Sequence, residues 1–174
     1  MRVFVGVIVL LLFVSCKEKK IVLQEDFIFT STDWGQMKSL KFVNDTVFIA
    51  YNYPQKLYVY YYLLNDNEKT KINSYLDILK VKDYNTEYIK DGLVCGSAYQ
   101  FEFIERNKKI FVYGAESEEI QLLNSFSDYL YFVDKTKKES VYWDLDIDFG
   151  NTDVFHEPEP PMEFIQDWDS EDIN

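Results

Sequence analysis

The feature that most constrains the fold of this chain is a repeated order of predicted elements, in which a hairpin is followed by a helix. Two segments of alternating polarity, joined by a polar turn, precede a segment with helical periodicity, first in residues 37–80 and again in residues 98–134. Alternation indicates strands with one buried face, and such a face needs a second layer to cover it. The chain therefore predicts an α+β fold, with an antiparallel sheet of about five to seven strands and two helices packed on one face.

The first hairpin also predicts its own register. Residues 44–45 are Asn and Asp, which tolerate positive φ and suit a two-residue turn. With this turn, Phe42 lies opposite Val47 and Leu40 lies opposite Ile49, so that all four face the core. Further strands are expected at residues 27–30, 57–63 and 141–149.

Two helices are expected, over residues 66–79 and 117–133. The first begins with Asn65 and Glu68 at the spacing of a capping box. Its apolar residues recur at i, i+3, i+4 and i+7, which is typical of an amphipathic helix: Ile72, Tyr75, Leu76 and Leu79. The second hairpin is expected to turn within residues 106–109, near Asn107. Six side chains should share one core: Phe42, Ile49, Leu76, Phe101, Phe103 and Leu123.

The N-terminal segment has the features of a signal peptide. Arg2 precedes an apolar run over residues 3–14, which is too short for a bilayer span of about 20 residues. The run ends at Phe-Val-Ser-Cys, with Cys16 followed by Lys-Glu-Lys-Lys. This sequence resembles the lipobox of bacterial lipoproteins, and the whole pattern resembles small lipoproteins of Bacteroidetes.

That resemblance implies cleavage before Cys16, lipid attachment to its sulfur and amino group, and a place in the cell envelope. More than one acyl chain would hold the protein firmly on a membrane. Lys17 stands where a retention signal for the inner membrane would have Asp, which implies the outer membrane, on its periplasmic face or at the cell surface. The alternatives are an ordinary secretory signal cleaved near Ser15 and an uncleaved anchor.

The expected organisation has four parts. They are a signal peptide in residues 1–15, a short tether in residues 16–24, a single α+β domain in residues 25–150 and an acidic, Pro-containing tail in residues 151–174. Most of the net charge of -12 lies near the C-terminus, since residues 139–174 hold 12 acidic and no basic side chains. A basic protein is therefore the expected kind of partner, and three apolar residues of the tail could contribute to docking: Phe155, Ile165 and Trp168. The alternative is a poorly ordered end that only increases solubility.

Composition excludes several classes of function. The acidic balance argues against nucleic acid as a partner, because phosphate binding needs clustered Lys and Arg. One histidine, His156, excludes zinc sites built from several histidines. Acylation of Cys16 would leave only Cys95, so no intramolecular disulfide could form, and nothing local orients Cys95 and His156 as a catalytic pair. No cofactor motif is present in the sequence.

Two patterns are candidate binding sites. Asp144, Asp146 and Asp148 resemble the start of a calcium loop, but a half-exposed strand with apolar residues between the aspartates explains the same pattern. A tyrosine stripe could bind a sugar or a protein partner, or it could form core packing under the helices: Tyr51, Tyr53, Tyr58, Tyr60 and Tyr62.

The sequence thus favours a lipid-anchored envelope protein that acts as a non-enzymatic binding module. The alternative is an acidic immunity or inhibitor lipoprotein that neutralises a basic toxin or enzyme. An enzymatic function has the least support, since no residue pattern points to a catalytic site.

Overall fold

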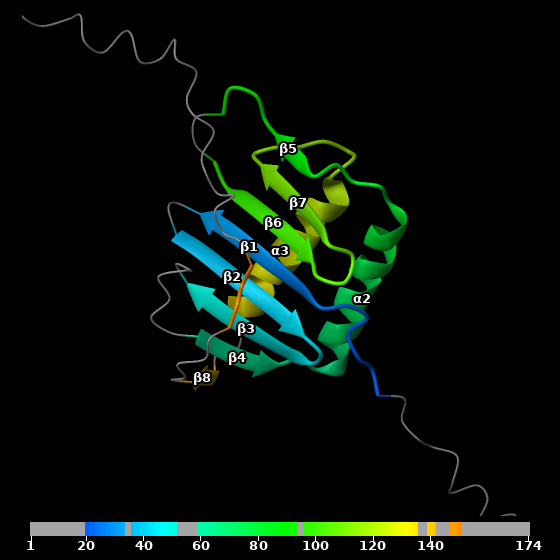
Figure 1. Ribbon diagram of the computed structural model, residues 1–174, viewed down its shortest axis with the longest axis vertical. Helices are drawn as coiled ribbons and strands as arrows, with labels where there is room; N and C mark the ends of the chain where they lie inside the picture. The colour runs from blue at the N-terminus through cyan, green and yellow to red at the C-terminus, as the bar shows by residue number, and fades with distance from the viewer. Residues whose placement is uncertain are drawn as a thin grey trace, which may run out of the picture.

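The computed structural model describes residues 20–33, 36–51, 59–93, 96–135, 139–141 and 147–150. These residues form one sheet of eight strands in the order β5-β7-β6-β1-β2-β3-β4-β8. The strands are β1 (Phe27–Asp33), β2 (Gln36–Val43), β3 (Thr46–Tyr51), β4 (Val59–Leu63), β5 (Glu87–Ile89), β6 (Ala98–Phe103), β7 (Lys108–Tyr113) and β8 (Glu139–Val141). The helices are α2 (Asp66–Val81) and α3 (Gln121–Lys135), and Figure 1 shows α3 behind the sheet.

The α+β prediction is confirmed, with two differences in the sheet. Its eight strands exceed the five to seven expected, because β5 and β8 have only three residues each and are too short to show alternation. Every neighbouring pair is antiparallel except β5 and β7, which pair in parallel at one edge. The strand expected over residues 141–149 is limited, in the described part, to Glu139–Val141.

The predicted register of the first hairpin is confirmed. Phe42 pairs with Val47 and Leu40 pairs with Ile49. Asn44 has a φ of 53°, the left-handed conformation that its turn position requires. The second hairpin turns at residues 104–107, with Asn107 at a φ of 47°.

The second turn therefore starts two residues before the expected residues 106–109. Lys108 and Lys109 do not belong to it; they begin β7 and pair with Phe103 and Glu102. An ion pair of 3.0 Å between Lys109 Nζ and Glu102 Oε2 accompanies the backbone pairing. Two consecutive lysines are typical of a turn in sequence. In the structure, however, Lys108 and Lys109 pair with residues of β6.

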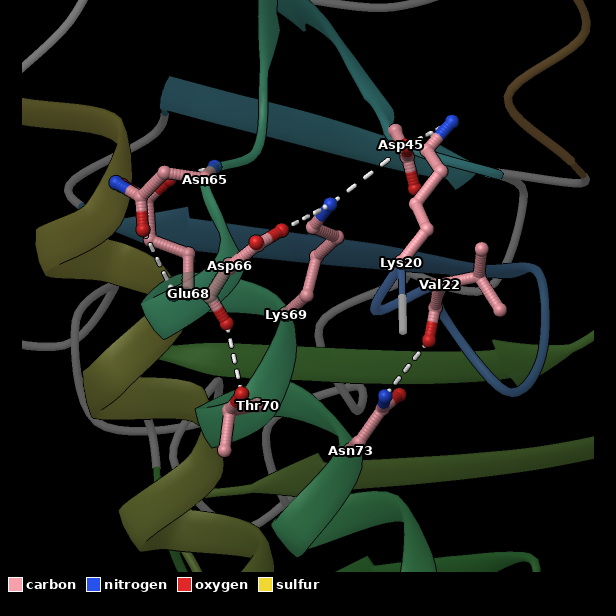
Figure 2. Close-up of polar contacts among 9 residues, drawn as sticks. All are labelled: Lys20, Val22, Asp45, Asn65, Asp66, Glu68, Lys69, Thr70 and Asn73. Carbon is pink, nitrogen blue, oxygen red and sulfur yellow. Dashed lines mark hydrogen bonds and ion pairs between the residues drawn. The ribbon is translucent and has the colours of Figure 1, made fainter. Parts of the chain in front are cut away.

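The first helix is confirmed and the second begins later than predicted. The backbone N–H of Glu68 donates to Asn65 Oδ1 at 3.0 Å, and that of Asn65 donates to Glu68 Oε2 at 2.8 Å, which completes the capping box (Figure 2). The second helix begins at Gln121 rather than residue 117. Before it, the N–H of Ile120 donates to Ser117 O, a three-residue spacing typical of a tighter turn.

The main core lies between the sheet and the two helices. All six side chains predicted to share it are fully buried there: Phe42, Ile49, Leu76, Phe101, Phe103 and Leu123. Phe126 of α3 joins the two layers, since its ring stacks on Phe101 at 5.1 Å between centroids and on Tyr75 of α2 at 4.7 Å. Stacked aromatic pairs add stability beyond the area that they bury.

A second, smaller cluster lies on the opposite face of the sheet. There the short segment 147–150, drawn in orange in Figure 1, crosses the strands, and Phe149 packs with Ala50 and Val59. Lys41 Nζ donates to Asp148 O at 2.7 Å and ties this segment to β2. This segment thus covers a part of the second face of the sheet.

Candidate functional site

Several residues weighed in the sequence lie outside the described residues. These are Cys16, Cys95, His156, Asp144, Asp146 and the tail residues Phe155, Ile165 and Trp168. The lipid attachment and the docking tail therefore stay predictions. So does the expectation that Cys95 and His156 form no catalytic pair, and most of the calcium pattern stays untested.

Asp148 is the one member of the calcium pattern among the described residues, and its side chain forms a hydrogen bond within a local turn. Its Oδ1 accepts the backbone N–H of Gly150 at 2.8 Å, and its side chain is exposed. Ile147 and Phe149 on either side pack against the sheet, as the alternation interpretation requires. Within the described ranges, no three His, Cys, Asp or Glu side chains are grouped as metal ligands would be.

The described tyrosines of the stripe belong to the core. Tyr62 is buried in the main cluster, and Tyr60 packs against it with its ring 6.0 Å from that of Tyr51, edge to face. For these three, the core-packing interpretation is confirmed. Tyr53 and Tyr58 lie outside the described residues.

The candidate site is a cleft of about 530 Å³ between the sheet and α3. It opens where β1 ends, β6 begins and β7 ends, so that three strands and one helix contribute to it. Most lining residues carry hydroxyl, amide or carboxylate groups: Ser31, Thr32, Ser97, Tyr99, Glu116, Asn124, Ser127, Asp128 and Tyr131. Such a cleft offers several hydrogen-bonding groups within one concave surface, and groups of this kind fix the orientation of a polar ligand.

Local backbone geometry places these groups. Ser31 lies two residues after Phe29 and thus on the same face of β1, the face that α3 covers. Asn124, Asp128 and Tyr131 recur at spacings of four and three along α3, which puts them on one side of the helix. Strand alternation therefore directs Ser31 toward the cleft, and helical periodicity directs the three α3 side chains toward it.

Tyr99 links the cleft to the core. Its ring packs edge to face on Phe101 with 5.7 Å between centroids, and its hydroxyl donates to Asn124 Oδ1 on α3. Burial raises the pKa of Tyr99 well above its usual value, and the charge of Asp128 adds to this effect. Tyr99 is therefore a neutral hydrogen-bonding group at neutral pH, held in place by both layers.

The charge of the cleft is negative. Glu116 and Asp128 are exposed carboxylates in its lining, and the described lining residues include no Lys or Arg. One described cation contacts the lining, since Lys38 Nζ lies 4.3 Å from the ring centroid of Tyr131. The arrangement suits a polar ligand that is neutral or positively charged, and it disfavours an anion.

Sequence reasoning did not identify this cleft. Its residues come from four separate segments between positions 31 and 131, and none of them forms a local motif. The one available signal was the polar residue spacing along α3, which also fits an ordinary solvated helix face.

Comparisons with protein-family models, with curated proteins and with solved structures found no match for this chain. Among the described residues, neither helix has the length and apolar character that a membrane span needs.

Proposed function

We propose that this protein is a lipid-anchored envelope protein that acts as a non-enzymatic binding module. Its binding site would be the cleft between β1, β6, β7 and α3, and its ligand a polar group that carries positive charge. The observation that carries this proposal is the described lining of the cleft, in which hydroxyl and amide groups accompany the carboxylates of Glu116 and Asp128 and no Lys or Arg is among the described lining residues.

The anchor would be the lipid expected on Cys16. Lys20, the first residue that the structure describes, stands four positions after Cys16. Replacing Cys16 with Ser should move the protein from the membrane fraction to the soluble fraction of the cell envelope. A Cys16→Ser protein that still sediments with outer membranes would contradict the anchor.

The cleft can be tested with short peptides as probes. We expect the amidated peptide acetyl-Gly-Lys-Gly to bind and its Glu counterpart not to bind, as measured by NMR shifts of α3 amides. Asp128→Asn should weaken binding of the Lys peptide by about fivefold, the value of an ion pair worth about 1 kcal/mol.

Asp77→Asn is the matched control, because it removes the same charge from an exposed position on α2 that does not line the cleft. Equal weakening by both variants would mean that overall charge, not the cleft, attracts the peptide. No shift with either peptide would overturn the cleft as a site for a cationic group.

An acidic immunity or inhibitor protein is the second candidate function, and the carboxylates in the lining of the cleft favour it. A basic toxin or enzyme would then be the partner, with one of its Lys or Arg side chains in the cleft. Binding should weaken as salt rises, because screening over about 8 Å at physiological ionic strength removes long-range attraction. Deleting residues 151–174 should slow association with such a partner.

A further inference from the structure

Residues 20–25, which precede the first strand, pack against the domain. Figure 2 shows this segment beside α2, with Asn73 of the helix directed at its backbone. Asn73 Nδ2 donates to Val22 O at 2.8 Å, and the N–H of Gln24 donates to Asn73 Oδ1 at 3.0 Å. One amide side chain thus pairs with two backbone groups, as a neighbouring strand would.

Further contacts hold the segment on either side of Asn73. Leu23 is buried in the main core, and Lys80 near the C-terminal end of α2 donates to Gln24 Oε1 at 3.0 Å. Glu25 forms a 2.7 Å ion pair with Arg106 Nε from the turn between β6 and β7. The side chain of Glu25 is only 1% exposed, so this end of the segment is fixed inside the domain.

The other end meets a small charged network, also drawn in Figure 2. Lys20 Nζ lies 3.3 Å from Asp45 Oδ2, and Lys69 Nζ lies 3.6 Å from the same oxygen and 2.7 Å from Asp66 Oδ1. The hydrogen bond with Asp66 is the main cause that raises the pKa of Lys69, and the charge of Asp45 adds to it against the effect of burial. Lys69 thus stays protonated and joins the turn of the first hairpin to α2.

All of these contacts lie at the end of the sheet where β1 begins. The turns at residues 44–45 and 104–107 are at this end, since Phe27 pairs with Phe42 and Phe103, which lie just before these turns. The cleft is at the opposite end, where Ser31 and Thr32 lie in the last part of β1. Seven strand residues at about 3.3 Å each separate the two ends by roughly 20 Å.

We infer that residues 20–25 act as a clip that holds the domain on its lipid anchor, with the turns at residues 44–45 and 104–107 toward the bilayer and the cleft facing away from it. This inference rests on the proposed lipid at Cys16. Four residues span at most about 14 Å, so Cys16 and Lys20 cannot be farther apart than that. If residues 20–25 were released from the domain, Cys16 and Glu25 could be about 31 Å apart, which is enough for the domain to reverse its orientation on the membrane.

The clip itself is tested by hydrogen exchange of the mature protein. Asn73→Ala removes the acceptor of the Gln24 N–H, and exchange of that amide should become roughly tenfold faster. Ser74→Ala is the control, because the Ser74 hydroxyl donates to Lys71 O on the exposed side of the same helix. Fast exchange at Gln24 in the unmodified protein, or equal effects of both variants, would overturn the clip.

The orientation is tested by energy transfer in vesicles of phosphatidylethanolamine and phosphatidylglycerol that carry a rhodamine-labelled lipid. The full acylated protein, with Cys95 replaced by Ser, carries a donor dye at Glu105→Cys or at Ser97→Cys. Both positions are exposed; the first lies in the 104–107 turn and the second at the edge of the cleft.

Transfer should be more efficient from position 105 than from position 97, and Asn73→Ala should reduce this difference. Equal transfer from the two positions in membrane-bound protein would overturn the orientation but leave the anchor intact. Protein that retains Cys16 and still fails to join the vesicles would instead overturn the anchor of the proposed function.

Discussion

Removing the positive partner of a buried carboxylate should destabilise this domain more than removing both partners. Glu25 is 1% exposed and Arg106 is 26% exposed, with 2.7 Å between Arg106 Nε and Glu25 Oε1. The guanidinium also lies 4.0 Å from the ring centroid of Phe103. Arg106→Met keeps an aliphatic side chain over that ring and removes only the charge and the hydrogen bond.

The expected cost follows from the exposure of the two groups. Breaking a buried ion pair typically costs about 3–5 kcal/mol, because the remaining charge has no partner. The partial exposure of Arg106 places Arg106→Met near the lower end, at about 3 kcal/mol in the free energy of unfolding. Glu25→Gln leaves an acceptor for Arg106 and should cost about 1 kcal/mol.

The double variant Glu25→Gln with Arg106→Met should be more stable than Arg106→Met alone, since no buried charge remains. Equilibrium unfolding in urea at neutral pH measures all three variants, and the single variant should also melt roughly 6–12 °C lower. A cost for Arg106→Met within about 0.5 kcal/mol of zero would refute this reasoning. So would a double variant that costs at least the sum of the two single ones.

Three further outcomes are expected. Phe101→Ala should cost about 3–5 kcal/mol in urea unfolding, because Phe101 is fully buried, whereas Ile104→Ala, at a side chain 45% exposed, should change stability by less than about 0.5 kcal/mol. Asn65→Ala should cost about 1 kcal/mol through loss of the capping box, and a neutral result would mean that α2 does not depend on its cap. The raised pKa of Tyr99 should not affect the free energy of unfolding below about pH 10. Above about pH 10 the free energy of unfolding should fall, because Tyr99 loses its phenolic proton at a lower pH in the unfolded state than in the folded state. The same measurement on Tyr99→Phe should show a shallower fall between about pH 10 and pH 11, and an unchanged slope would contradict the burial of Tyr99.

Local patterns were sufficient for much of the fold. The pairs of Phe42 with Val47 and of Leu40 with Ile49 follow from alternation and from a turn of two residues that tolerate positive φ. The start of α2 follows from the spacing of Asn65 and Glu68. Each of these features depends on residues close together in the chain, so their physical cause is visible in sequence.

The errors occurred where a distant partner decides the conformation. Lys108 and Lys109 look like turn residues, but pairing with β6 draws them into β7. Residues 117–120 look helical, yet a tighter turn precedes α3 at Gln121. Residues 147–150 keep the predicted alternation without forming a strand, because Phe149 packs across the face of the sheet.

The sequence by itself determined which side chains would form the core. The periodicity of each strand and helix places its apolar residues on one face, and the hydrophobic effect favours burial of that face. Only the tertiary structure decided where the polar groups meet. Asn124 reaches Tyr99 because α3 packs beside β6, and Asn73 reaches Val22 and Gln24 because α2 passes beside the segment before β1. These contacts join residues 25 to 51 positions apart, and hydrogen bonds over such separations depend on how the layers are placed rather than on any local preference of the chain.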